Sequence, residues 1–229
     1  MAQMVITIDG PAASGKSTVA KLVAEKLGAS FLDTGAMYRA VTLAAIEAGL
    51  DLRNEEKLLE VMQTTDFQFS ERNGQMAVFI DGVDVTEQLR QPKVTANAKH
   101  VASKASLRAK LVQMQRQFAK GTKKIVTEGR DQGTVAFPDA DIKFYLTADP
   151  KERARRRQIE LRSKGIDDGL EQVQNAIEQR DKSDENRAVG PLKPAYDAVI
   201  IDTTDLSVEQ VVEKVLYYIE QKCLKKNCG

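Results

Sequence analysis

The stretch best suited to chemistry is GPAASGKST, residues 10–18, which follows the apolar run MVITID. It fits the pattern G-x-x-x-x-G-K-[ST], in which glycines allow a tight loop whose backbone N–H groups point at an anion. A helix expected to begin there adds the positive end of its dipole. Lys16 can reach the outer phosphates of a nucleoside triphosphate, and the Ser17 hydroxyl is the expected Mg²⁺ ligand. We therefore expect ATP, with Mg²⁺, at Gly10, Pro11, Ala12, Ala13, Ser14, Gly15, Lys16, Ser17 and Thr18.

The rest of the sequence disfavours two common uses of such a loop. A switch GTPase normally carries an N/T-K-x-D segment that reads guanine, and the sequence has none. A motor ATPase normally has a strand that ends in a carboxylate, whereas IKFYLTADP reaches Asp149 only after a Thr-Ala turn. What is done with the triphosphate must therefore be inferred from other residues.

Three further clusters of polar residues predict a second anionic substrate. They are Thr34, Gly35 and Arg39; Arg130 and Asp131; and Arg180, Asp184 and Arg187. Ligands of open parallel sheets bind beyond the carboxyl ends of the strands, and two of these clusters follow predicted strands. Each cluster alone is equally compatible with a surface ion pair of little consequence. Their expected position at the same end of the sheet as the phosphate-binding loop (the P-loop, residues 10–18) favours a second substrate site.

The segment KERARRRQIELRSK carries Arg153, Arg155, Arg156 and Arg157 on one predicted helix. It is either a solvated basic face or a lid, at about residues 151–168, whose arginines close over the transferring phosphate. Phosphoryl transfer requires charge neutralisation and in-line placement, with little covalent help from the protein. An acceptor that is itself an ionised phosphate needs no general base. A chain with a single histidine and clustered arginines suits that chemistry.

Composition restricts the class of protein further. The chain has 229 residues, 29% of them charged, and a net charge of +1. A nucleic-acid-binding protein usually shows a clear basic excess, so we expect no nucleic-acid partner. Two cysteines in a lysine-rich tail, Cys223 and Cys228, are too few for a disulfide framework or a zinc site. No apolar run is long enough to span a membrane and no leader pattern is present, so we expect a cytoplasmic protein.

Strands and helices alternate along the chain in a way that predicts how these residues are positioned. Apolar runs predict strands at 5–9, 30–35, 123–129, 141–148 and 197–204, with helical spacing between them. The expected fold class is α/β, a five-stranded parallel sheet flanked by helices. Residues 66–85 alternate around Asn73-Gly74 and predict a small antiparallel insertion of two or three strands. Capping boxes are expected at Asp149 with Glu152, and at Ser207 with Gln210.

The motifs occur in an order that resembles the bacterial-type cytidylate kinases, a family of P-loop nucleoside monophosphate kinases. The resemblance covers nearly the whole chain and rests on ITIDGPAASGKST, LDTGAMYR, EGRDQGTVAFPDAD, RARRR and RDKSDENRAVGPL. It implies a P-loop NTPase fold that transfers the ATP γ-phosphate to CMP or dCMP with Mg²⁺, in pyrimidine metabolism. It also implies one kinase domain, usually monomeric, over 1–229: a core (about 1–63, 91–150 and 169–229), a monophosphate-binding insertion (about 64–90) and a lid (about 151–168).

The resemblance also implies roles for individual residues. Arg39, Arg130 and Arg187 would hold the acceptor phosphate, and Thr34, Arg180 and Asp184 would lie around that phosphate and its sugar. Asp131 would accept a hydrogen bond from the cytosine amino group, with Arg108 beside the base. Arginines among Arg153, Arg156 and Arg157 would belong to the lid. The expected catalytic set is Lys16, Arg130, Arg153, Arg157 and Arg187.

Base recognition is where the sequence departs from the family. Lys99 stands where a serine that contacts the base is common, so either Thr95 or Asn97 substitutes or fewer contacts hold the base. A carboxylate at Asp131 would meet a carbonyl in uracil, and an unpaired buried polar group costs roughly 1–3 kcal/mol, which favours CMP over UMP. Whether Asp9 or Asp33 lies near Mg²⁺ is open.

Two alternatives remain beside this hypothesis. One is a kinase of another small acceptor, such as UMP, AMP or shikimate. The other is an ATP-dependent regulatory or nucleic-acid-binding module whose arginine helix contacts RNA, with an affinity that falls steeply with salt.

Overall fold

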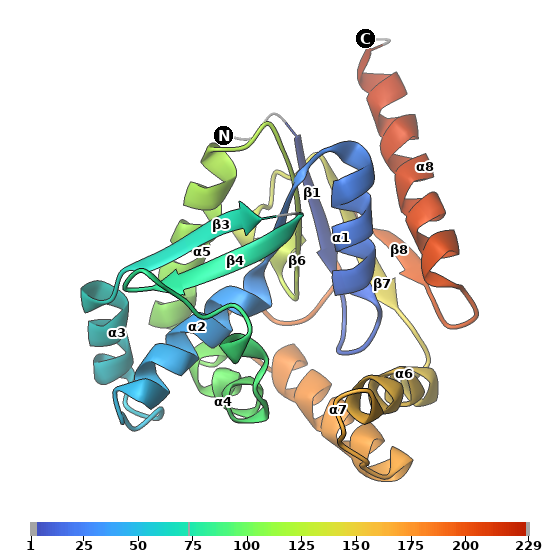
Figure 1. Ribbon diagram of the computed structural model, residues 1–229. Coiled ribbons are helices and arrows are strands. Elements are labelled where there is room, and N and C mark those ends of the chain that lie inside the picture. The colour runs from blue at the N-terminus through green and yellow to red at the C-terminus, as the bar shows by residue number, and fades with distance from the viewer. Residues whose placement is uncertain (1–3, 73, 228–229) are drawn as a thin grey trace.

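A five-stranded parallel sheet forms the centre of the computed structural model, which describes residues 4–72 and 74–227 (Figure 1). The strand order is β2-β6-β1-β7-β8. The strands are β1 (Met4–Asp9), β2 (Ser30–Asp33), β6 (Lys124–Gly129), β7 (Ile142–Thr147) and β8 (Val199–Asp202). All five were predicted, and the parallel register aligns their carboxyl ends: Asp9 is paired with Gly129, and Asp33 with Glu128.

Alternating side chains of the strands pack into two separate cores. On β1, Ile6 and Ile8 face a core shared with α1 (Lys16–Leu27) and α8 (Val208–Asn227). On β6, Val126 joins that core, whereas Ile125 faces the opposite core with α2 (Thr34–Glu47) and α5 (Ala105–Lys120). Because both faces are covered, these strands are mostly apolar on both sides, as expected for a parallel sheet.

The predicted antiparallel insertion is present and has three strands. They are β3 (Phe67–Arg72), β4 (Gln75–Ile80) and β5 (Val83–Asp84), in that order. Gly74 has φ 68°, the left-handed conformation that a tight hairpin requires, while Asn73 lies outside the described residues, as does Cys228. Helix α3 (Glu55–Thr64), the turn η1 (Gln88–Arg90) and α4 (Pro92–Ala102) complete this side of the molecule (Figure 1).

Helices α6 (Pro150–Arg162) and α7 (Leu170–Glu185) pack together beyond the carboxyl ends of the strands (Figure 1). Asp149 caps α6 by accepting from the N–H groups of Lys151 and Glu152. A capping box also requires the Asp149 N–H to donate to the Glu152 carboxylate, and that part of the prediction is wrong. The Asp149 N–H donates to Thr204 Oγ1 instead, and the Glu152 carboxylate accepts from Arg155 and Arg156. The second capping box is confirmed: Ser207 and Gln210 bond each other's backbone N–H groups.

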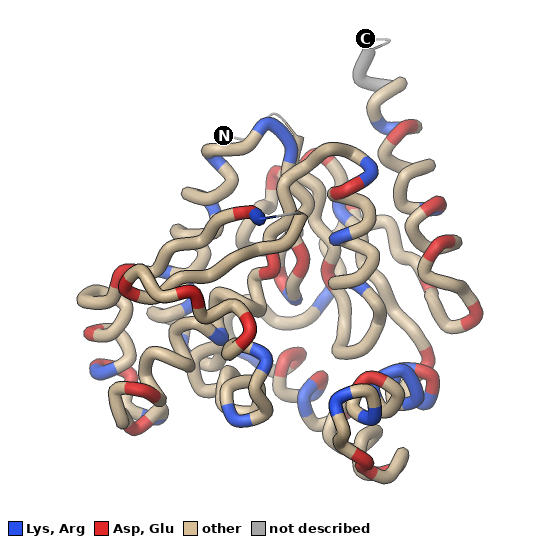
Figure 2. The backbone as a smooth tube through the Cα atoms, viewed as in Figure 1, with Lys and Arg blue, Asp and Glu red and all other residues tan. Residues whose placement is uncertain are grey.

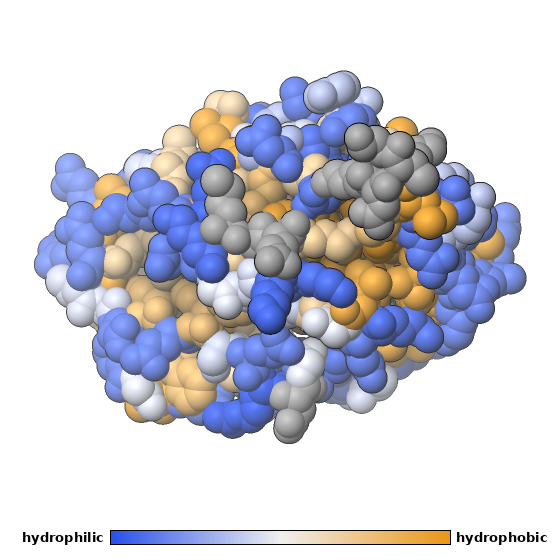
Figure 3. Space-filling view, turned by 90° about the horizontal axis from the view of Figure 1, so that it is seen from above, coloured by the Kyte–Doolittle hydropathy of each residue, from blue (hydrophilic) through white to orange (hydrophobic). Residues whose placement is uncertain are grey.

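Charged residues are spread along the chain, with lysines and arginines concentrated along α6 (Figure 2). The end of the molecule that carries both termini shows hydrophilic and hydrophobic residues intermixed (Figure 3). Within residues 4–72 and 74–227, no helix is long and apolar enough to cross a membrane.

Candidate active site

The P-loop joins β1 to α1 and is shaped by its glycines. Gly10 has φ 153°, and a Cβ there would lie 2.1 Å from the backbone oxygen of Leu146 on β7. Gly15 has φ 86° and forms the N-terminal cap of α1. Ala13 also adopts a left-handed conformation, with φ 57°. A side chain at Gly10 would therefore collide with backbone, and the loop can lie this close to β7 only with glycine.

Lys16 and Ser17 emerge from the P-loop beside a buried carboxylate. The Lys16 ammonium donates to the Pro11 carbonyl at 2.8 Å, and burial, followed by the charge of Arg130, lowers its pKa to about 7. The exposed Ser17 hydroxyl donates to Glu128 Oε1 at 2.9 Å. Burial is also the main reason that the pKa of Glu128 is raised. An incoming triphosphate would satisfy the Lys16 charge that the protein leaves poorly compensated.

The end of β2 places the first predicted acceptor cluster next to this carboxylate. Asp33 caps α2 by accepting from the Ala36 N–H at 2.9 Å, and its other oxygen accepts from Arg39 at 2.9 Å. The Thr34 hydroxyl donates to the Glu128 backbone oxygen at 2.8 Å. The structure therefore brings Thr34 and Arg39 to the edge of the sheet that holds the P-loop.

The second and third predicted clusters meet at Asp184 on α7. Arg130 Nε donates to one Asp184 oxygen at 2.9 Å, and Arg187 Nη1 lies 3.5 Å from the other. Arg180 is exposed nearby, and the charge of Arg130 is the main reason that its pKa is lowered to about 10. Arg39 lowers the pKa of Arg180 further, so the three clusters share one strongly positive site.

Asp131 and Arg108 form a buried ion pair at the side of this site, with side-chain exposures of 5% and 3%. The Arg108 guanidinium also lies over the Tyr38 ring, 5.4 Å from its centroid. The loop that carries Asp131 is held by Asp9, which accepts from the N–H groups of Gln132 and Gly133 at 2.8 and 2.7 Å, at the start of the wide turn η2 (Gln132–Ala136). Burial raises the pKa of Asp9 to about 7.

Three of these arginines have unused hydrogen-bond capacity. The Nε atoms of Arg39, Arg108 and Arg187 are buried and have no partner among the described residues. Buried donors are normally satisfied by protein or water, and an unsatisfied one costs roughly 1–3 kcal/mol. Their clustering in one site indicates that a ligand with acceptor oxygens belongs there.

The arginines of α6 have different environments. Arg153 is buried and donates to the Ala148 and Ala12 carbonyls and to Asp181. Arg156 donates to Glu152 and to Thr203 in the loop after β8. Arg157 pairs with Glu160 and is part-exposed. It lies close enough to the site for its positive charge to lower the pKa of Arg180.

The candidates for the missing base contact lie on α4. Asn97 donates its amide to the Lys93 carbonyl of the same helix at 2.8 Å, and Lys99 is exposed. Thr95 is part-buried. Helix α4 reaches the Arg108–Asp131 pair through its last residue, Ala102, whose carbonyl accepts from Arg108 at 3.3 Å.

Sequence reasoning missed Glu128, Asp181 and Tyr38. A charged residue at the end of the apolar run KIVTEG could have indicated Glu128, because a buried strand carries a carboxylate only where it has partners. Asp181 and Tyr38 carry no comparable signal, since their partners are distant along the chain: Ala12 and Arg153 lie 169 and 28 residues from Asp181, and Arg108 lies 70 residues from Tyr38.

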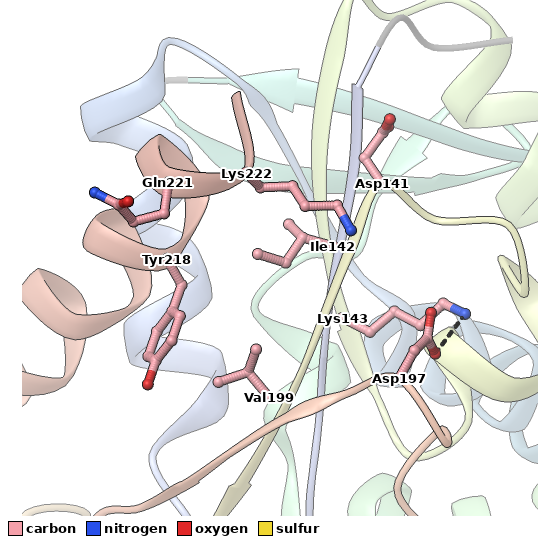
Figure 4. A pocket seen from close by; sticks show the side chains of 8 residues that line it. All are labelled: Asp141, Ile142, Lys143, Asp197, Val199, Tyr218, Gln221 and Lys222. Atoms are coloured by element: carbon pink, nitrogen blue, oxygen red, sulfur yellow. Dashed lines mark hydrogen bonds and ion pairs between the residues drawn. The ribbon is translucent and has the colours of Figure 1, made fainter. Parts of the chain in front are cut away.

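A separate hollow of about 160 Å³ lies between β7 and α8. It is lined by Ile142 and Val199, at the amino ends of their strands, and by the Lys143–Asp197 ion pair (Figure 4). It therefore opens at the edge of the sheet opposite to the P-loop.

Fold and site together define an α/β protein of the P-loop NTPase class, with a cluster of arginines beside the P-loop at the carboxyl ends of the strands. The fold resembles that of TT1252 from Thermus thermophilus, with a TM-score of 0.50 and 16% identity, covering 97% of this chain and 98% of that one.

Sequence comparison identifies the family within this class. The model of the cytidylate kinase family matches residues 6–221. Cytidylate kinases of Bacillus thuringiensis (strain Al Hakam) and Bacillus anthracis (strain CDC 684 / NRRL 3495) are each 48% identical over 212 residues, covering 92% of this chain and 93% of theirs. The chain belongs to the cytidylate kinase family, which confirms the resemblance of its motifs.

Proposed function

We propose that the P-loop holds ATP and that the arginine site holds CMP or dCMP, so that the γ-phosphate passes directly from one to the other. The activity is that of a cytidylate kinase, which produces ADP and CDP or dCDP. The observation that carries the assignment of sites is the position of Arg130. Its charge lowers the pKa of Lys16 in the P-loop and of Arg180 in the acceptor site. Two anions bound at these sites would meet at Arg130.

In the proposed mechanism, the acceptor phosphate displaces carboxylates from the arginines. Asp33 and Asp184 now neutralise Arg39 and Arg130. A phosphate offers more acceptor oxygens than either carboxylate and can also reach the buried Nε donors of Arg39 and Arg187. The ionised phosphate is its own nucleophile, so the side chains need only place it and neutralise the charge that spreads over the transferring group.

The residues beside the P-loop fit a Mg²⁺ ion that accompanies ATP. Ser17 and Glu128 offer hard oxygen donors in contact with each other, and the nearby negative charge of Asp33 raises the pKa of Glu128. Mg²⁺ prefers oxygen ligands and is usually held by one or two protein groups together with phosphates and water. Ser17 would hold the ion, with Glu128 beside it, and the ion would neutralise phosphate oxygens. Asp9 and Asp33 both have backbone N–H partners, so Glu128 is the stronger candidate.

Base selection is proposed to depend on Asp131. Its carboxylate would accept from the cytosine amino group while Arg108 holds it in place. Uracil presents a carbonyl at that position, which would leave the buried carboxylate facing an acceptor.

The lid, the oligomeric state and the location in the cell complete the proposal. Arg157 is the lid arginine best placed to close over the phosphates, because it is part-exposed and its charge reaches Arg180. We propose a single kinase domain that acts as a monomer in the cytoplasm, with the insertion and lid boundaries given above.

The test is ADP release with ATP and Mg²⁺, comparing CMP, dCMP, UMP, AMP and no acceptor. Stimulation by CMP and dCMP alone is expected. Comparable activity with UMP would contradict the role of Asp131 while leaving the phosphate sites intact. ATP turnover that ignores every acceptor would contradict the proposal as a whole.

A further inference from the structure

The P-loop peptide at Ala12 is held from outside the phosphate site. Its N–H donates to Asp181 Oδ1 at 3.0 Å, and its carbonyl accepts from Arg153 Nη1 at 3.1 Å. The two side chains come from α7 and α6 and are only 6% and 7% exposed. Both polar groups of one loop residue are therefore fixed by residues far away in the sequence.

Arg153 and Asp181 also bind each other. The Arg153 Nη1 that contacts Ala12 donates to Asp181 Oδ2, and Arg153 Nε donates to the Ala148 carbonyl after β7 at 3.1 Å. Ala12 packs with Ala154, Val173 and Ile177 in a small apolar cluster around the pair. Hydrogen bonds shielded from water in this way are stronger than exposed ones, and the loss of one partner is correspondingly costly.

The next residue explains why the loop needs such support. Ala13 has φ 57°, a conformation that costs a residue with a Cβ roughly 1–2 kcal/mol. Such a conformation persists only where the surroundings enforce it. The bonds at Ala12 fix the peptide that precedes this strained residue.

We propose that Arg153 and Asp181 are positioning residues that hold the P-loop in the shape that receives the triphosphate. They act through Ala12 and contact neither the phosphates of ATP nor the acceptor phosphate. This assigns Asp181 a role in ATP binding, and it gives Arg153 a role beneath the loop in place of one in a moving lid. The inference rests on the proposed binding of ATP at the P-loop.

The test is equilibrium binding of a non-hydrolysable ATP analogue with Mg²⁺, and separately of CMP, to wild type, Asp181→Ala and Asp181→Asn. Asp181→Ala removes the bonds that Asp181 accepts from the Ala12 N–H and from Arg153, and it is expected to weaken binding of the analogue about tenfold or more. Asp181→Asn keeps an oxygen for the Ala12 N–H and is expected to lose less. CMP binding is expected to stay within about twofold, because Arg180 and Asp184 of the same helix are unchanged. Asp197→Ala, which breaks the ion pair with Lys143 at the opposite edge, is the matched control and should change neither affinity.

Thermal melting of each variant establishes that it is folded at the assay temperature. If Asp181→Ala does not fold, Asp181→Asn and Arg153→Lys carry the test. Unchanged analogue affinity in folded variants would overturn the proposal. Equal weakening of the analogue and CMP would also overturn it, because that result indicates general loosening. A failure of the proposed function would look different: wild type itself would not bind the analogue.

Discussion

Replacing Asp131 by asparagine tests base recognition most directly, because it removes the charge and keeps the shape. Breaking a buried ion pair by removing one partner typically costs about 3–5 kcal/mol. Arg108 keeps other contacts here: it donates to the Ala102 carbonyl and lies over the Tyr38 ring. The asparagine oxygen can also still accept from Arg108. We therefore expect a smaller loss, about 2 kcal/mol, which lowers the Tm of a chain of this size by about 4–8 °C.

The kinetic effect follows from the chemistry of the base. The asparagine side chain can donate to the uracil carbonyl, whereas the carboxylate can only accept. Exchanging a matched for a mismatched buried pair is worth about 1–3 kcal/mol, or roughly 5- to 150-fold. The ratio of kcat/KM for CMP to that for UMP, measured by coupled ADP release, is expected to fall at least about fivefold.

The control for this variant is Asp197→Asn, the same substitution in the ion pair with Lys143 at the opposite edge of the sheet. It should leave the CMP-to-UMP ratio unchanged. If Asp131→Asn lowers the Tm while the ratio stays at the wild-type value, Asp131 supports Arg108 only and does not select the base.

Three further predictions concern the phosphate sites. Burial lowers the pKa of Lys16 to about 7 in the folded protein, against 10.5 unfolded, so this charge costs stability at pH 7 and the cost disappears as the pH rises to 10.5. Lys16→Met should abolish transfer yet raise the free energy of unfolding at pH 7, with a smaller gain in urea melts at pH 9; a less stable variant at pH 7 would refute this. Gly10→Ala should lower the Tm and abolish ATP binding, because the new Cβ would collide with the Leu146 backbone. Gly28→Ala is the control: Gly28 has φ 57° and open space around it, so this variant should lose only the roughly 1–2 kcal/mol that a left-handed conformation costs a residue with a Cβ. Arg187→Ala should raise the KM for CMP tenfold or more and leave the ATP affinity within about twofold; unchanged CMP kinetics would remove Arg187 from the site.

Local patterns determined most of the fold. Each strand of the main sheet is a short, mostly apolar run, and four of the five end in a polar residue. The α2 helix begins at a capping aspartate that the run SFLD itself supplies. The turn glycine of the insertion was likewise a local signal. Helix α3 was not predicted, although its signals are local: Asn54 caps it by accepting from the Lys57 N–H, and Leu58, Val61 and Met62 are spaced as on one face of a helix.

The sequence by itself determined the P-loop, the positions of the five strands with the motifs that follow them, and the family, since these depend on residue types at fixed short spacings. Only the tertiary structure decided which carboxylate neutralises which arginine, that Glu128 binds Ser17, and that Arg153 lies buried beneath Ala12. The Ser17–Glu128 and Ala12–Arg153 contacts join residues more than 100 positions apart. No local periodicity encodes them. The Ser17–Glu128 contact exists only once α1 packs beside β6, and the Ala12–Arg153 contact only once α6 and α7 are packed against the carboxyl ends of the sheet.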